Sequence, residues 1–175
     1  MRILILAVLG LLMWGNIGYS QIVNIEDKRY QKDTTGWFGL LDLSMSYVRN
    51  SGSVLSMAGT ARVDYLRAKS SNLFLANYRV VRTGAADLIN DGFLHYRYGR
   101  SLNKRLQWEV FGQIQYNERL ALKLRTLLGT GPRLTVLDKE KRKVYWGILY
   151  MYEYDELTEG QPYFRDHRLS MSLAL

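Results

Sequence analysis

The sequence contains no cysteine, two prolines and two histidines among its 175 residues. The absence of cysteine excludes disulfides, cysteine-ligated zinc clusters, thiol catalysis and c-type haem attachment. The two histidines, His95 and His167, are too few for a histidine-rich metal site. We therefore expect neither a metal nor a cofactor.

Apolar runs long enough to cross a bilayer as a helix are also missing. The longest run after the first 20 residues covers nine positions, 144–152, whereas a membrane helix needs about 17–25 apolar residues. Residues 1–20 predict a secretory signal, because Arg2 precedes a 12-residue apolar stretch and the small residues Gly18 and Ser20 mark a cleavage site. Polar residues that follow this stretch disfavour the alternative, an uncleaved membrane helix. Export without cysteine points to a bacterial periplasm or outer membrane.

The remaining chain divides into a polar segment and a strand-rich segment. Residues 21–36 are polar and of mixed charge, and they predict a periplasmic leader. From residue 37 onward apolar and polar residues alternate with period two, which indicates strands, and no helical period is sustained. The predicted strands are 9–16 residues long, which exceeds the soluble mean of about 5–6 and suits tilted membrane strands. We predict an all-β fold for 37–175, an antiparallel up-and-down transmembrane β-barrel of at least eight strands, near 37–49, 53–66, 72–82, 92–100, 106–117, 122–137, 144–155 and 167–175.

The alternation gives each predicted strand two different faces. One parity is apolar and holds no charged residue, and a membrane barrel turns such a face toward lipid. The other parity predicts a lumen lined by Asp42, Arg62, Asp64, Arg79, Arg97, Glu109, Arg125, Arg133, Glu153 and Arg168. On the apolar parity, a predicted aromatic girdle comprises Trp37, Tyr47, Trp108, Tyr116, Trp146 and Tyr154. The alternative is a soluble periplasmic β-barrel that turns its apolar face inward around a lipophilic ligand.

The turns between the predicted strands indicate an orientation and a set of partners. RAKSS (67–71), SLNKR (101–105) and DKEKRK (138–143) are short and would lie on the periplasmic side. GAADLIND (84–91) and ELTEGQPYFRD (156–166) are the longest and would lie outside the cell. Basic turns beside a membrane contact lipid phosphates, so outer-membrane lipids are the expected partners, together with the barrel-assembly machinery. Positive charge scattered without a basic and aromatic surface argues against nucleic acid.

Five short motifs follow one another along 37–175. They are Tyr96-Arg97-Tyr98; Glu109, Phe111 and Gln113; Arg125, Leu127, Gly129, Gly131 and Arg133; Tyr152-Glu153; and Arg168. In this order, and with the opening GWFGLLDLSMSYVRNSG at 36–52, they resemble the salt-induced outer membrane protein family, a bacterial domain of unknown function. The resemblance implies an outer-membrane β-barrel with no established ligand or reaction, and a chain that continues through further strands after Leu175. Pro132 departs from the pattern, and it predicts a bulge or weakened pairing.

The charged parity leaves two functions open. Its excess of arginine predicts a narrow, net-positive path for small anionic solutes. If the same side chains fill a small lumen, they predict a plugged scaffold with a structural role in envelope integrity. A lipid-modifying enzyme is a further alternative, for which His167 near the head-group zone is the best candidate, but we expect no enzymatic activity. Gly129 and Gly131 share the charged parity, where we expect them to relieve crowding rather than bind phosphate.

Overall fold

The computed structural model describes residues 35–50, 52–84, 86–139, 142–158 and 163–174. The predicted signal at 1–20 and the leader at 21–36, up to residue 34, therefore lie outside the described residues. The chain divides into two units, Met1–Gln31 and Lys32–Leu175, and everything that follows concerns the second. Within the described ranges no helix is long and apolar enough to cross a membrane.

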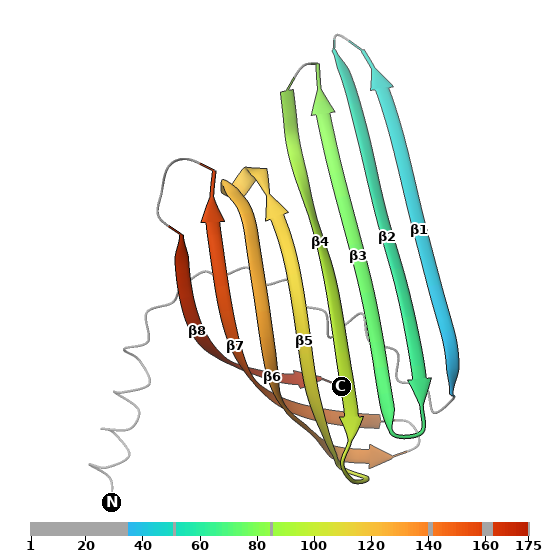
Figure 1. Ribbon diagram of the computed structural model, residues 1–175. Helices are drawn as coiled ribbons and strands as arrows, with labels where there is room; N and C mark the ends of the chain where they lie inside the picture. The colour runs from blue at the N-terminus through green and yellow to red at the C-terminus, as the bar shows by residue number, and fades with distance from the viewer. Residues whose placement is uncertain (1–34, 51, 85, 140–141, 159–162, 175) are drawn as a thin grey trace, which may run out of the picture. The chain divides into compact units, whose positions relative to one another are not determined.

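The second unit is one antiparallel sheet in which every strand pairs with its neighbours in the chain (Figure 1). A short 3-10 helix, η2 (Glu118–Leu120), lies between the fifth and sixth strands. The eight strands are β1 (Gly36–Arg49), β2 (Ser53–Arg67), β3 (Ser70–Thr83), β4 (Ala86–Ser101), β5 (Leu106–Asn117), β6 (Leu122–Lys139), β7 (Arg142–Leu157) and β8 (Phe164–Ala174). The predicted all-β class and the up-and-down order of eight strands are confirmed.

The two loops predicted to be longest are both shorter in the structure. The sequence GAADLIND was expected to be a loop, but β4 already begins at Ala86 and pairs there with the end of β3. A register shift between Val81 and Arg82 interrupts the simple alternation at this point, which explains why period two failed to reveal the strand. The loop predicted at 156–166 is also shorter, since β7 ends at Leu157 and β8 begins at Phe164.

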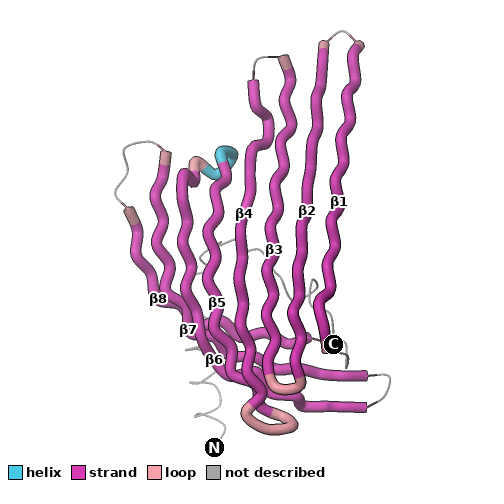
Figure 2. The backbone as a smooth tube through the Cα atoms, turned by 45° about the vertical axis from the view of Figure 1, so that its right-hand side comes forward, coloured by secondary structure: helices cyan, strands magenta, loops and turns pink. Residues whose placement is uncertain are grey.

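The sheet is strongly curved, and β6 and β7 bend most (Figures 1 and 2). The ladder between these two strands is interrupted at Gly131 and Pro132, although its register is the same on both sides. Proline has no N–H to donate, so it removes one hydrogen bond from the ladder. The weakened pairing predicted at Pro132 is therefore confirmed.

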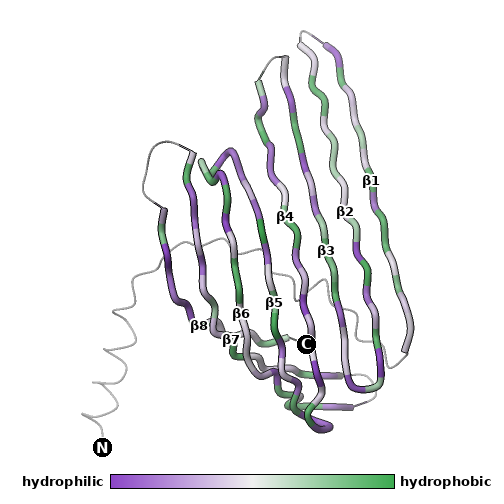
Figure 3. Tube along the Cα trace, viewed as in Figure 1, coloured by the Kyte–Doolittle hydropathy of each residue, from purple (hydrophilic) through white to green (hydrophobic). Residues whose placement is uncertain are grey.

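Burial separates the two faces of the sheet in the sense opposite to that of a soluble core. The apolar face, defined as the one that carries Leu43, is exposed: Leu43 is 73% exposed, Leu128 57% and Leu169 64%. The charged face, defined as the one that carries Glu109, lies on the inside of the curve, where Glu109 is 2% exposed and Glu153 1%. Figure 3 shows the two kinds of residue alternating along the strands.

The charged face also holds apolar side chains that the sequence did not assign to it. These residues are buried among the charges, and they form most of the hydrophobic core of the described sheet: Leu73, Leu75, Phe111, Leu127, Leu149 and Met151. Each of them is an even number of residues from a charged residue on its own strand, so the alternation of side chains along a strand puts them on the charged face. The inner side is thus a packed mixture of apolar and ionic groups.

The two outermost strands are not paired with each other, so the described sheet is open. In β1 every residue from Gly39 onward is exposed, on both faces. In β8 the apolar face is exposed and the charged face is half-buried toward the end of the strand. Burial of the charged face is therefore concentrated between the two edge strands, over β2 to β7.

Candidate functional site on the charged face

The cross-strand register places all ten predicted lumen residues on one face. Arg62 pairs with Leu75, Leu75 with His95, and His95 with Gln113, and the same face continues to Glu153 and beyond. Along each strand every second side chain points to the same face of the sheet. The structure thus brings together nine of the ten, while Asp42 stands apart, exposed on the edge strand β1 opposite Thr60.

The first ionic cluster joins three neighbouring strands in the middle of the charged face. The guanidinium Nη1 of Arg97 on β4 donates to Glu109 Oε2 on β5 at 2.9 Å. Arg133 on β6 approaches the other oxygen of Glu109, with its Nη1 3.9 Å from Oε1. All three residues are buried, and the guanidinium of Arg133 also lies 4.4 Å from the ring centre of Tyr145. Both arginines therefore approach the same carboxylate in a site that excludes most water.

The second ionic cluster is centred on Glu153 of β7. Arg125 on β6 reaches Glu153 Oε1 at 2.8 Å and donates two hydrogen bonds to Asp155, at 2.7 and 2.6 Å. Arg168 on β8 reaches Glu153 Oε2, also at 2.8 Å. The bidentate contact between Arg125 and Asp155 fixes the guanidinium plane, because two parallel N–H bonds allow a single orientation. These ion pairs link three strands across the charged face.

Sequence reasoning missed three carboxylates that complete this pattern. Asp91, Asp155 and Asp166 each lie on the charged face beside a predicted arginine: Arg79 contacts Asp91 at 2.7 Å and Arg168 contacts Asp166 at 3.8 Å. The signal was present, since Asp155 shares the parity of Glu153 and Asp91 that of His95. With Arg62 bound to Asp64 at 2.6 Å, all six predicted arginines have a carboxylate oxygen within 4.0 Å. These carboxylates reduce the excess of arginine on which the predicted net-positive lining depends.

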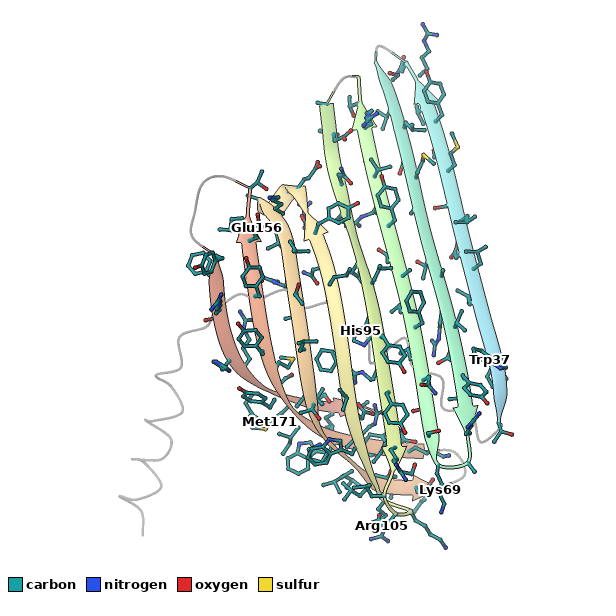
Figure 4. The ribbon with its side chains drawn as sticks, in the orientation of Figure 1. Trp37, Lys69, His95, Arg105, Glu156 and Met171 are labelled. Carbon is teal, nitrogen blue, oxygen red and sulfur yellow. The ribbon has the colours of Figure 1, made fainter. Side chains whose placement is uncertain are left out.

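A hydrogen-bonded chain of one imidazole and two amide side chains lies next to the two clusters, around His95 in the middle of β4 (Figure 4). The Nδ1 atom of His95 is 2.9 Å from Gln113 Oε1, and Gln113 Nε2 donates to Gln115 Oε1 at 2.6 Å. The imidazole is 1% exposed and stacks on Phe111, with ring centres 5.4 Å apart. A Cβ atom on Gly129 would come within 2.3 Å of that phenyl ring, which confirms that this glycine relieves crowding.

His167, which the sequence favours as the candidate for lipid chemistry, lies away from these clusters, on β8. Its Nδ1 atom is 2.6 Å from the hydroxyl of Tyr150, and its ring packs against Tyr150 and Tyr152. The neighbouring hydroxyl is therefore a phenol rather than the aliphatic alcohol of a serine hydrolase. Among the described residues no group of three His, Cys, Asp or Glu side chains is placed to hold a metal ion.

The six predicted girdle residues fall into two rows at opposite ends of the sheet. β1, β5 and β7 run in the same direction, and a tryptophan lies within four residues of the start of each one. A tyrosine lies within three residues of the end of each of these strands. The first row is Trp37, Trp108 and Trp146, and the second is Tyr47, Tyr116 and Tyr154. In the first row Trp37 stacks on Tyr65, with ring centres 4.3 Å apart.

Comparison with known proteins gives a family but no characterised relative. Neither the curated proteins nor the solved structures contain a match to this chain. One family model matches residues 41–175, which cover all of the sheet except the start of β1. The chain therefore belongs to DUF481, a protein family of unknown function.

Proposed function

We propose that residues 37–175 form the wall of a β-barrel in the bacterial outer membrane, with a structural role in the envelope. The observation that carries this proposal is the inverted burial of the two faces: the apolar face is exposed, and the face that carries the ions is buried. Lipid-spanning strands alternate between apolar residues that face outward and polar residues that face inward. Membership of DUF481 and the resemblance to the salt-induced outer membrane proteins are consistent with this proposal.

The exposed face carries an energetic cost in water that a bilayer removes. On β1 alone Leu41, Leu43 and Met45 are each about 70% exposed. Moving one large apolar side chain out of water contributes about 1.5–3 kcal/mol to stability. A contiguous face of exposed apolar side chains such as this one is rare on soluble monomers. The two rows of aromatic residues near the strand ends would then lie at the two head-group layers. Outer-membrane lipids and the machinery that inserts barrels are the partners this proposal requires.

The runner-up, a soluble barrel that holds a lipophilic ligand, requires the opposite arrangement. Its apolar residues would line the inside and its charged residues would face water. In this sheet Glu109, Glu153 and Arg97 are buried while the large apolar residues of the other face are exposed. The geometry therefore favours the membrane protein.

The interior favours a structural role over solute passage. A conducting lumen keeps its charged groups in water, whereas Arg97, Glu109 and Arg133 are buried. Both arginines approach Glu109, and their guanidinium groups lie over the rings of Phe111 and Tyr145. Side chains that fill the inside leave little room for a path. Purified protein in a planar bilayer is therefore expected to give no steady conductance. A steady conductance whose ion selectivity changes in an Arg125→Glu variant would replace this role with solute passage.

Nitroxide labels on the two faces test membrane insertion directly. Since the chain has no cysteine, single Leu43→Cys and Arg125→Cys variants can each be labelled at one position. In lipid vesicles the label at 43 is expected to collide readily with oxygen, which concentrates in hydrocarbon, and poorly with a water-soluble nickel complex. The label at 125 is expected to be protected from both reagents, because Arg125 packs against Glu153 and Asp155.

A Leu169→Cys variant provides a matched third position, since Leu169 is 64% exposed, close to the 73% of Leu43, but lies on the opposite edge strand. It is expected to give the same oxygen response as position 43. Hydrocarbon exposure at 125 combined with protection at 43 and 169 would show that the sheet is turned the other way, and the proposal would have to be abandoned.

A further inference from the structure

The two ends of the sheet carry different charges. The β2–β3, β4–β5 and β6–β7 hairpins lie at one end, and with one flanking residue on each side their described side chains include five basic residues and no acidic residue. The described side chains of the connections at the opposite end, counted in the same way, include two basic residues and one acidic residue: Arg49, Arg119 and Glu118. The five basic residues, which we call the basic rim, are Arg67, Lys69, Lys104, Arg105 and Lys139.

The tryptophan row lies at the same end as the basic rim. Figure 4 shows Trp37 at the end of the sheet where Lys69 and Arg105 lie, with Glu156 at the other end. The side chains of Lys69, Lys104 and Arg105 are all exposed. Indole rings prefer the layer between hydrocarbon and water, so this end of the apolar face is marked as a head-group layer independently of its charge.

Aromatic and basic residues contact one another at this end. Arg67 Nε donates to the hydroxyl of Tyr65 at 2.6 Å, and its guanidinium lies 4.9 Å from the centre of that ring. Tyr65 in turn stacks on Trp37, which holds the three side chains in one column at the end of β1 and β2. On β4 the exposed Arg100 is the cross-strand neighbour of Trp108. The cations are thus positioned just beyond the rings, where lipid phosphates would lie.

The opposite end combines tyrosines with two exposed ion pairs. Lys123 contacts Glu156 at 2.6 Å, and Arg82 donates two hydrogen bonds to Asp87. A cation held by a neighbouring carboxylate attracts a lipid phosphate less than one without such a partner. The contrast between the ends therefore singles out the basic rim.

We propose that the basic rim binds the headgroups of anionic phospholipids in the leaflet that surrounds this end of the sheet. The inference rests on the proposed membrane insertion, and it goes further by naming the lipid class and the end that recognises it. Each Lys or Arg near an anionic surface contributes about a fivefold change in affinity. Because the rim is exposed to solvent, the preference falls as the salt concentration rises.

Energy transfer from tryptophan to labelled lipids measures this preference. Three of the four tryptophans belong to the row beside the rim, and the fourth, Trp14, lies in the predicted signal. The mature chain in phosphatidylcholine vesicles is given traces of dansyl-labelled phosphatidylglycerol or dansyl-labelled phosphatidylcholine. The anionic probe is expected to compete for the protein surface several-fold better than the zwitterionic one. A triple Lys69→Glu, Lys104→Glu, Arg105→Glu variant is expected to weaken that preference at least about tenfold.

A control variant changes the net charge equally at the other end. The Arg49→Glu, Arg119→Glu, Arg165→Glu triple variant also reverses three exposed positive charges, so a general effect of net charge would appear in both variants. The control is expected to keep the preference within about twofold of the parent protein. Equal losses in the two variants, or no preference in the parent, would overturn the inference. If the label at 43 meanwhile reports hydrocarbon, insertion stands and only the lipid preference fails, whereas a protected label at 43 removes the proposed function itself.

Discussion

Replacing Glu109 by alanine is expected to lower the free energy of unfolding by about 3–5 kcal/mol. Glu109 is 2% exposed, and it is the carboxylate that both Arg97 and Arg133 approach, at 2.9 and 3.9 Å. Without it the buried guanidinium groups of Arg97 and Arg133 would both lose the carboxylate that they approach, in a site that is largely closed to bulk water. Urea titration of the protein in lipid vesicles, followed by tryptophan emission, measures the loss.

Two further variants separate charge from packing in this experiment. Glu109→Gln preserves the shape and the hydrogen-bond acceptor but removes the charge, so its loss is expected to be smaller than that of Glu109→Ala and larger than about 1 kcal/mol. Glu156→Ala breaks the exposed pair with Lys123, for which a loss of at most about 1 kcal/mol is expected. If Glu109→Ala proved as mild as Glu156→Ala, the interior cluster would be solvated, and the argument for a packed scaffold would lose its support.

Replacing Gly131 by valine is expected to disrupt the pairing of β6 with β7. A Cβ atom at position 131 would lie 2.0 Å from the backbone carbonyl oxygen of Ile148 and 3.0 Å from the Cα atom of Leu149. Backbone atoms cannot rotate away as a side chain does, so the two strands must separate at the bend where the ladder is already interrupted. The cost is expected to be at least about 3 kcal/mol, the upper range for overpacking. Resistance to unfolding during gel electrophoresis without heating is a direct measure of the folded fraction.

Gly112 provides the matched control on the adjacent strand β5. A Cβ atom there would meet only the side chain of Leu128, at 3.5 Å, and the carbonyl oxygen of Leu127, at 4.0 Å, both ordinary contacts. Gly112→Ala is expected to leave stability unchanged or to raise it by about 0.4–1 kcal/mol, because it reduces the freedom of the unfolded chain. A Gly131→Val variant that behaves like Gly112→Ala would show that β6 and β7 do not approach each other this closely.

The strands and their two faces could be predicted from the sequence, because the alternation of apolar and polar residues marks each strand and also assigns each side chain to a face. Predicted and observed ends of β5 coincide at 106–117, and most other strands differ by one to three residues. The same parity brought Arg97 and Glu109 to one face before any contact was known. Identity of the partner residues could not be predicted in the same way, because cross-strand register depends on turn geometry and bulges.

The missed features all depend on register or on mixed composition. The start of β4 was lost because the shift between Val81 and Arg82 changes the parity within the strand pair. Asp155 was overlooked as a partner of Arg125, although both lie on the charged parity, because its pairing requires the alignment of β6 with β7. Leu127 and Met151 were overlooked because leucine and methionine on a charged face contradict a strict division into polar and apolar sides.

Sequential strand order has a consequence for how the interior charges are assembled. Each cross-strand ion pair of the charged face described above joins chain-adjacent strands: β3 with β4, β4 with β5, β5 with β6, β6 with β7, and β7 with β8. Contacts between neighbours close short loops, whose entropic cost is low. The sheet can therefore grow like a zipper, with each arriving strand delivering the counter-charge for the one before it. In this order of assembly, the arginines of these cross-strand pairs gain their carboxylates when neighbouring strands pair, before the sheet is complete.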